Sequence, residues 1–219
     1  MRILVVAATE AEIAPVVARM DSTPTRGTRV DTYTHAAHDV DVLITGVGMV
    51  ATAAWCSRVL AQTPYGLALN LGVCGSFDRA LAPGTVVHVV SDRLAELGAE
   101  DDERFLTLEE LQLPGESEFV NLEPPANPAL DRLPAVTGIT VNTAHGSERS
   151  IAAVVRRFKP QVESMEGAAF MSACLIRQIP FAQVRAVSNF VERRNRGAWK
   201  MADAIRSLGD AALTILSHA

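Results

Sequence analysis

The sequence RILVVAATEAE, residues 2–12, joins an apolar run directly to two glutamates. The run at residues 3–8 contains no polar residue and does not alternate, which is typical of a strand buried on both faces of a sheet. It is too short to cross a membrane. A helical pattern follows at residues 10–20. This stretch therefore predicts a buried strand that turns at once into a helix.

The same succession of strand and helix recurs along the chain. Further apolar runs lie at residues 40–45, 67–71, 86–90, 139–141 and 181–187. Helical patterns lie at residues 50–62, 147–157, 165–177 and 199–217. The alternation predicts an α/β fold, a three-layer α/β/α sandwich in which helices cover both faces of a mixed, largely parallel sheet.

Composition narrows the class of protein. The chain has 219 residues, 48% of them hydrophobic and 21% charged, which suits a single domain spanning residues 1–219. The formal charge of −5 provides no basic surface for nucleic acid. Cys56, Cys74 and Cys174 are odd in number and lack CxxC spacing, so we expect neither a disulfide framework nor a zinc site. The sequence shows no signal peptide and no membrane span, so we expect a cytoplasmic protein without a membrane partner.

Residues 95–134 differ from the rest of the chain, because they begin acidic and contain five of the eleven prolines. A linker between domains is one interpretation. We favour a long surface excursion from one domain, since the apolar run at residues 139–141 resumes the core. Excursions of this size in compact enzymes are often functional or lie at subunit contacts.

Ligands of open α/β sheets bind at the carboxyl ends of the strands, so the residues after each apolar run are the site candidates. Glu12 follows the first run. Thr9-x-x-Glu12 fits a capping box, and a carboxylate there can also orient a water. Gly46-Val47-Gly48-Met49-Val50-Ala51 follows the second run and fits a dinucleotide turn, but Asn70 stands where the acid of that motif is expected. We therefore favour a tight glycine turn without a dinucleotide.

Three later strand ends carry further candidates. Cys74 and Gly75 follow the third run, where small residues let the backbone approach a flat ligand. Met165 and Glu166 stand at a predicted helix start. The helix dipole and core packing account for this pair, and the pair can equally hold a ribose diol. Asn189 follows the last run and is either a turn residue or an amide that offers a ligand one donor and one acceptor.

Taken together, these motifs resemble the nucleoside phosphorylase and nucleosidase superfamily, particularly its methylthioadenosine/S-adenosylhomocysteine nucleosidase branch. The motifs are Ala8-Thr9-Glu10-Ala11-Glu12, Gly46-Val47-Gly48, Asn70-x-Gly72-x-x-Gly75, Met165-Glu166-Gly167-Ala168-Ala169 and Arg185-Ala186-Val187-Ser188-Asn189. The resemblance implies a hydrolase of N-ribosidic bonds in which Glu12 activates water, while Met165 and Glu166 hold the ribose of a purine nucleoside. It also implies a homodimer or higher homo-oligomer, with the excursion lending apolar residues to a neighbour's site. We expect no metal ion and no cofactor.

Asn189 departs from the resembled branch, which usually has an aspartate there that helps to protonate adenine at N7. An asparagine can donate to O6 and accept from a protonated N7, which favours hypoxanthine over adenine. Residues 188–195 also resemble the futalosine hydrolases, which implies futalosine as substrate, hypoxanthine and dehypoxanthine futalosine as products, and a place in menaquinone biosynthesis. A methylthioadenosine nucleosidase, a purine nucleoside phosphorylase and a non-catalytic nucleotide-binding module stay open as alternatives.

Futalosine carries a benzoate, which a guanidinium can bind. Arg193, Arg194 and Arg196 follow the expected base site and each can supply this guanidinium, and Arg193 is the one that we count among the substrate-binding residues. A solvated charged turn is the alternative interpretation. His145 follows the apolar run at residues 139–141, and a single histidine at such a position is more often structural than catalytic.

Overall fold

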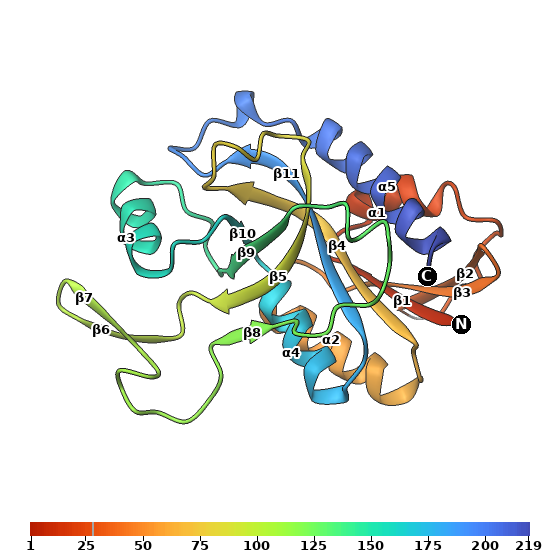
Figure 1. Ribbon diagram of the computed structural model, residues 1–219, viewed down its shortest axis with the longest axis horizontal. Coiled ribbons are helices and arrows are strands. Elements are labelled where there is room, and N and C mark those ends of the chain that lie inside the picture. The colour runs from red at the N-terminus through yellow and green to blue at the C-terminus, as the bar shows by residue number, and fades with distance from the viewer. Residues whose placement is uncertain (28) are drawn as a thin grey trace.

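Nine strands form one sheet within residues 1–27 and 29–219, the part of the chain that the computed structural model describes (Figure 1). The order across the sheet is β10 (Val162–Ser164), β9 (Ala135–Thr140), β5 (Val86–Leu94), β11 (Phe181–Phe190), β4 (Leu67–Ser76), β1 (Arg2–Ala7), β3 (His38–Ile44) and β2 (Val30–His35). β8 (Glu118–Val120) pairs with β5. Strands β3, β1, β4 and β11 run parallel, whereas β5 is antiparallel to β11 and β2 is antiparallel to β3.

The sheet curls on itself at one end. β10 pairs in parallel with β9, and it also pairs in antiparallel fashion with the end of β4. In the second pairing Val162 lies opposite Ser76, and Glu163 lies opposite Gly75. Strands β4, β11, β5, β9 and β10 therefore close a small ring, and this closure brings Glu163 next to a strand that carries two predicted site residues.

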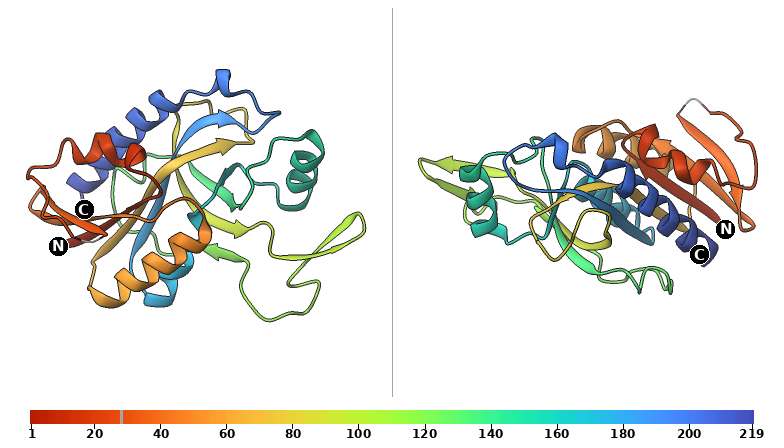
Figure 2. Two further views of the ribbon diagram at one scale, coloured as in Figure 1. Left: turned by 180° about the vertical axis from the view of Figure 1, so that it is seen from behind. Right: turned by 90° about the horizontal axis from the view of Figure 1, so that it is seen from above.

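Helices cover both faces of the sheet (Figure 2). They are α1 (Glu10–Val17), α2 (Met49–Gln62), α3 (Glu148–Phe158), α4 (Gly167–Arg177), the 3-10 helix η1 (Arg196–Ala198) and α5 (Met201–Ser217). α1 and α5 bury Ile13 and Leu208 against one face, and α2 and α4 pack around Phe170 on the other. Burying one such side chain contributes about 1.5–3 kcal/mol. The predicted three-layer α/β/α sandwich with a mixed sheet is confirmed.

The predicted elements are present with shifted ends. β4 and β11 extend past the apolar runs, so that Cys74, Gly75 and Asn189 lie inside strands rather than after them. Mutual pairing continues these strands where the apolar pattern has stopped. Val187 pairs with Cys74 and Asn189 with Gly75, with an irregularity between the two pairs.

Residues 95–134 leave the sheet and then return to it. A hairpin of β6 (Gly98–Asp101) and β7 (Arg104–Thr107) projects from the body of the protein (Figure 1). β8 then rejoins the sheet, and Leu130 is buried in the core beside α5. Asn127 fixes this return, because its Nδ2 donates a hydrogen bond to Ile215 O at 3.0 Å. The predicted excursion is confirmed for the hairpin, whereas the later part of the segment belongs to the sheet and core.

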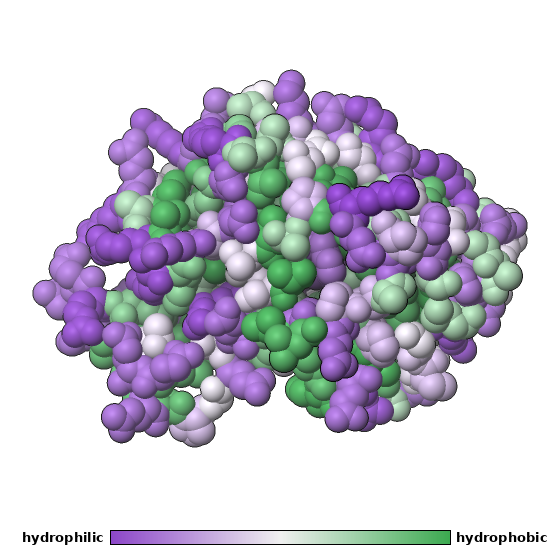
Figure 3. Space-filling view, in the orientation of Figure 1, coloured by the Kyte–Doolittle hydropathy of each residue, from purple (hydrophilic) through white to green (hydrophobic). Residues whose placement is uncertain are grey.

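The surface of the protein has both hydrophobic and hydrophilic regions. Hydrophobic side chains gather at the centre of the face in Figure 3, and hydrophilic ones dominate its left margin. Among the described residues, Leu122, Val50 and Ile176 are the most exposed large hydrophobic ones, at 85%, 80% and 75%. None of the described helices is long and apolar enough to cross a bilayer.

Candidate active site

A cavity of 530 Å³ lies at the carboxyl ends of β1, β4, β10 and β11. Its lining brings together six of the seven residues predicted from the sequence: Glu12, Cys74, Gly75, Met165, Glu166 and Asn189. These residues are up to 177 positions apart in the chain, between Glu12 and Asn189. The strand order therefore assembles what the sequence only suggested, because neighbouring strands end at the same edge of the sheet.

Glu12 closes the start of α1 and also lines the cavity. Its Oε2 accepts hydrogen bonds from Thr9 N at 3.0 Å and from Thr9 Oγ1 at 2.8 Å. Its Oε1 accepts from Val73 N at 3.1 Å. The capping interpretation is thus confirmed, and it does not compete with a functional one. Three donors fix a buried carboxylate in one position, as a group that orients a water requires.

Glu166 precedes the first turn of α4 and faces the turn after β3. Its Oε1 accepts a hydrogen bond from Gly48 N at 3.1 Å, and its Oε2 lies 3.4 Å from Arg185 Nη1. Gly48 has φ +104°, a backbone conformation that residues other than glycine rarely adopt. The glycine turn, which resembled a dinucleotide motif, therefore serves to aim a backbone N–H at this carboxylate.

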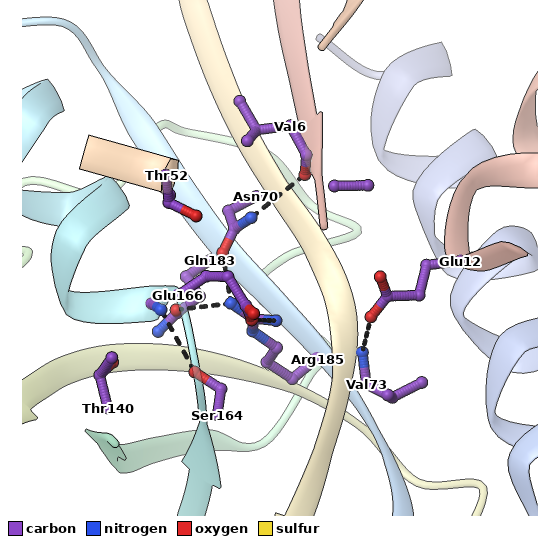
Figure 4. Close-up of polar contacts among 12 residues, drawn as sticks. Val6, Glu12, Thr52, Asn70, Val73, Thr140, Ser164, Glu166, Gln183 and Arg185 are labelled. Carbon is purple, nitrogen blue, oxygen red and sulfur yellow. Dashed lines mark hydrogen bonds and ion pairs between the residues drawn. The ribbon is translucent and has the colours of Figure 1, made fainter. Parts of the chain in front are cut away.

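Arg185 lies next to Glu166 and Gln183 and is 1% exposed (Figure 4). Its Nη2 donates to Asn70 Oδ1 and, at 3.4 Å, to Gln183 Oε1. Gly72 permits this arrangement, because a Cβ there would overlap the Arg185 guanidinium and lie 3.0 Å from Glu12 Oε1. The guanidinium thus approaches both cavity carboxylates. Sequence reasoning assigned no role to Arg185, although a lone arginine inside an apolar strand is a signal, since arginine is almost never fully buried unless paired.

Asp92 is a second buried charge that the sequence did not reveal. Its Oδ1 accepts from Thr140 Oγ1 at 2.9 Å, and its Oδ2 accepts from Gln183 Nε2 at 2.8 Å. Burial raises the pKa of this carboxyl from 3.8 to about 7, while Thr140 and Arg185 oppose the rise. Gln183 contacts both Asp92 and Arg185, so one buried polar network supports the floor of the cavity.

Asn189 is held by its two neighbours in the chain. Its Oδ1 accepts from Ser188 Oγ at 2.7 Å, and its Nδ2 donates to Phe190 O at 2.9 Å. A side-chain amide has two donor hydrogens and two acceptor lone pairs. One hydrogen and one lone pair are therefore left for a ligand.

Cys74 lines the cavity near Asn189, and its thiol is not reactive. Its side chain is 3% exposed, and burial raises the pKa of the thiol to about 12. The thiol is therefore neutral at physiological pH and a poor nucleophile. Its carbonyl oxygen lies 3.1 Å from Ser188 Oγ and shares the single hydroxyl hydrogen with Asn189 Oδ1, which is closer at 2.7 Å.

His145 has a carboxylate partner, Glu163, which the sequence did not reveal. His145 Nδ1 lies 2.7 Å from Glu163 Oε2, and His145 N donates to Glu163 Oε1 at 3.1 Å. The ring packs edge-on against Phe77, with 6.2 Å between the ring centroids. Both members of the pair line the cavity.

The arginines after β11 do not all reach the cavity. Arg194 lines both this cavity and a second one beside α3, whereas Arg193 lines the second cavity alone. Arg196 is exposed in η1. The Arg194 guanidinium carbon lies 5.3 Å from the centroid of the Trp199 ring, which also lines the first cavity. No group of three or more His, Cys, Asp or Glu side chains that can hold a metal ion occurs in the described ranges.

Known proteins share this fold and part of this sequence. The sequence profile of the Phosphorylase superfamily matches residues 2–217. Futalosine hydrolase from Streptomyces coelicolor is 31% identical over 225 residues, which cover 96% of this chain and 93% of the relative. Among solved structures, futalosine hydrolase from Helicobacter pylori has a TM-score of 0.85 at 14% identity, over 100% of this chain and 98% of that one.

An adenosine-acting enzyme has the same fold. The 5′-methylthioadenosine/S-adenosylhomocysteine nucleosidase of Neisseria meningitidis, solved with methylthio-immucillin-A, has a TM-score of 0.81 at 17% identity, over 100% of this chain and 99% of that one. The fold alone therefore does not select between a futalosine and a methylthioadenosine substrate.

Proposed function

The chain belongs to the phosphorylase superfamily, and we propose that it is a nucleosidase that hydrolyses the N-ribosidic bond of futalosine. The products are hypoxanthine and dehypoxanthine futalosine, which gives the protein a place in menaquinone biosynthesis. The observation that carries this proposal is Asn189, which stands at the cavity wall with one donor and one acceptor to spare. Its amide matches O6 and a protonated N7 of hypoxanthine, whereas the amino group of adenine would meet the amide donor.

The ribose lies between the two carboxylates in this proposal. Glu166 accepts hydrogen bonds from the 2′- and 3′-hydroxyls, and Met165 packs beneath the sugar. Breaking the N-ribosidic bond builds positive charge at C1′, and a carboxylate held near that charge stabilises the transition state more than the ground state. Gly48 N and Arg185 hold Glu166 in place for this role.

Glu12 acts on the other reactant, water. Thr9 and Val73 fix both of its oxygens, and Oε1, which accepts one hydrogen bond where Oε2 accepts two, keeps a lone pair for the water. The water attacks C1′, its oxygen bonds to the sugar, and one of its protons goes to Glu12. The Arg185 guanidinium lies close to Glu12 at Gly72 and contacts Glu166, so its positive charge offsets the negative charges of these two carboxylates.

A phosphorolytic reaction fits the cavity poorly. A phosphate needs several cationic or N–H donors at one place. Of the described residues that line the cavity, Arg194 is the one arginine or lysine, and the buried Arg185 already contacts Glu166, Asn70 and Gln183. Water is therefore the favoured acceptor of the ribosyl group.

The test is incubation of the purified protein with futalosine, inosine and methylthioadenosine, with and without phosphate, followed by chromatography of the bases. We expect hypoxanthine from futalosine at a rate that phosphate does not change. Adenine release from methylthioadenosine at a comparable rate would reverse the assignment of the base, and ribose 1-phosphate products would reverse the assignment of the reaction.

Three finer assignments complete the proposal. The benzoate of futalosine binds an arginine of the segment after β11, where Arg193 was the residue expected from the sequence and Arg194 is the one at the cavity. The protein acts in the cytoplasm as a homodimer or higher homo-oligomer. Light scattering of the purified protein tests the assembly.

A further inference from the structure

We propose that His145, positioned by Glu163, donates the proton that the purine needs to leave. This inference rests on the proposed function, because it concerns the leaving group of that reaction. It assigns a chemical role to a pair of side chains that the mechanism above does not use.

The need for a proton donor follows from Asn189. Hypoxanthine leaves more readily as a neutral molecule than as an anion, so a ring nitrogen must gain a proton as the bond breaks. A carboxylic acid at the position of Asn189 can supply that proton, whereas an amide can only hydrogen-bond to the result. The buried thiol of Cys74, with its pKa raised to about 12, is too weak an acid for this task.

The location of the pair matches this need. Glu163 pairs with Gly75 across β10 and β4, and Asn189 pairs with Gly75 across β11 and β4. A Cβ placed on Gly75 would lie 3.5 Å from Glu163 Cγ and also 3.5 Å from Asn189 Nδ2. The two side chains therefore flank the same glycine, and the carboxylate that orients His145 lies beside the amide assigned to the base.

The orientation of the imidazole is fixed as well. Glu163 binds both the backbone N–H and Nδ1 of His145, and Phe77 packs against the edge of the ring. Nε2 is the nitrogen left to a ligand, since the described residues bind the backbone N–H and Nδ1 of His145 and not Nε2. The side chain of His145 is 14% exposed and that of Glu163 is 7% exposed. A carboxylate against Nδ1 both fixes the ring and stabilises positive charge on it, which suits a proton donor.

Cleavage of the N-ribosidic bond is coupled to two proton transfers. The bond between C1′ and N9 breaks and its electron pair goes to the purine. His145 Nε2 gives a proton to N7, directly or through one water, and Asn189 Oδ1 then accepts a hydrogen bond from the new N–H. Water bonds to C1′ and gives a proton to Glu12. Neutral hypoxanthine leaves. His145 regains a proton from solvent, and Glu12 releases its proton to solvent.

The experiment compares two leaving groups. Futalosine releases a purine that requires a proton, whereas 4-nitrophenyl β-D-ribofuranoside releases a phenolate that does not. In His145→Gln we expect kcat on futalosine to fall about 100-fold or more, and kcat on the nitrophenyl riboside to stay within about threefold. Glu163→Gln should show the same selectivity with a smaller loss. His218→Gln, at the exposed end of α5, is the matched control and should change neither rate.

His145→Phe separates proton transfer from packing, because it keeps an aromatic ring against Phe77. We expect it to lose kcat on futalosine as His145→Gln does, with its melting temperature unchanged. Wild-type-like turnover of futalosine by either His145 variant would overturn the inference, and so would equal losses on both substrates. If the wild-type protein releases no hypoxanthine from futalosine, the proposed function itself fails, which is a different result.

Discussion

In the proposed reaction, a single amide, that of Asn189, sets the preference for the base. Its neighbours Ser188 and Phe190 take one acceptor site and one donor hydrogen, and what remains is complementary to a 6-oxopurine. The arrangement depends on amide chemistry rather than on shape, since aspartate has nearly the same volume. The preference can therefore be tested by an exchange that leaves the cavity wall intact.

We predict that Asn189→Asp changes the preferred base. A carboxylate cannot donate to O6, and in its protonated form it can serve adenine. The kcat/KM for futalosine should fall by about 100-fold or more, and that for methylthioadenosine should rise. Chromatography of both reactions measures the ratio. An unchanged ratio would show that Asn189 does not contact the base.

Glu12 has a structural role at the start of α1 and, in the proposed mechanism, a chemical role as the base, and one substitution separates the two. Glutamine also completes a capping box, so Glu12→Gln should keep the melting temperature close to that of the wild type. It cannot accept a proton from water, so kcat should fall by about 1000-fold or more. Glu10→Gln, in the same turn and exposed, is the matched control. A Glu12→Gln variant with normal kcat would remove Glu12 from the mechanism.

At the scale of elements, the site depends on how closely the strands approach one another. Gly72 in β4 leaves room for the Arg185 guanidinium from β11. We predict that Gly72→Ala lowers the free energy of unfolding by about 1–3 kcal/mol, because the guanidinium must move. Activity should fall as well, since Arg185 holds Glu166. Gly197→Ala, where the nearest atom is 3.5 Å away, should be neutral in both urea denaturation and turnover.

The buried network between β5 and β11 predicts a pH dependence. Burial raises the pKa of Asp92 to about 7, so the folded protein holds this proton more tightly than the unfolded chain does. The stability that follows is present below the unfolded pKa and is lost as the pH rises through the folded one. Between pH 4 and 7 the wild type should therefore lose stability relative to Asp92→Asn, on the order of a few kcal/mol.

Urea denaturation across that pH range measures the difference. Asp39→Asn, a change at an exposed aspartate, serves as the control and should show no pH-dependent difference from the wild type. A constant difference between the wild type and Asp92→Asn across the range would mean that Asp92 is ionised in the folded protein.

At the scale of the whole molecule, net charge opposes the binding of an anionic substrate. The chain carries a formal charge of −5, so the benzoate of futalosine requires a local cation. Arg194 is the cation at the cavity, and Arg193 faces the second cavity. We predict that Arg194→Ala raises KM for futalosine about tenfold and leaves KM for inosine unchanged, with Arg193→Ala as the matched control. Equal effects on both substrates would exclude a contact with the benzoate.

The fold was predictable to the extent that it follows the hydrophobic pattern. Long apolar strands such as β1 and β11 and the five helices were found, because burial on both faces leaves an unmistakable run of residues. Short strands such as β10 were missed, since three residues carry too little pattern and only pairing with distant strands makes them strands.

The site was predictable for polar residues that follow an apolar run or begin a predicted helix, and less so for residues whose role depends on distant partners. Glu12, Glu166 and Asn189 stood at expected positions. Arg185 and Asp92 lie within strands, and their roles depend on partners that topology brings near. The Glu163 partner of His145 was not predicted for the same reason, because the contact depends on β10 pairing with β9, the strand that precedes His145.

In the proposed reaction, water cleaves futalosine at this cavity and hypoxanthine is the base released. The most direct measurement is a reaction of the purified protein with futalosine in ¹⁸O-labelled water containing phosphate, followed by mass spectrometry of both products. We predict unlabelled hypoxanthine and a sugar product that carries one ¹⁸O at C1′. A phosphorylated sugar would contradict hydrolysis. No release of hypoxanthine while methylthioadenosine yields adenine would contradict futalosine as the substrate.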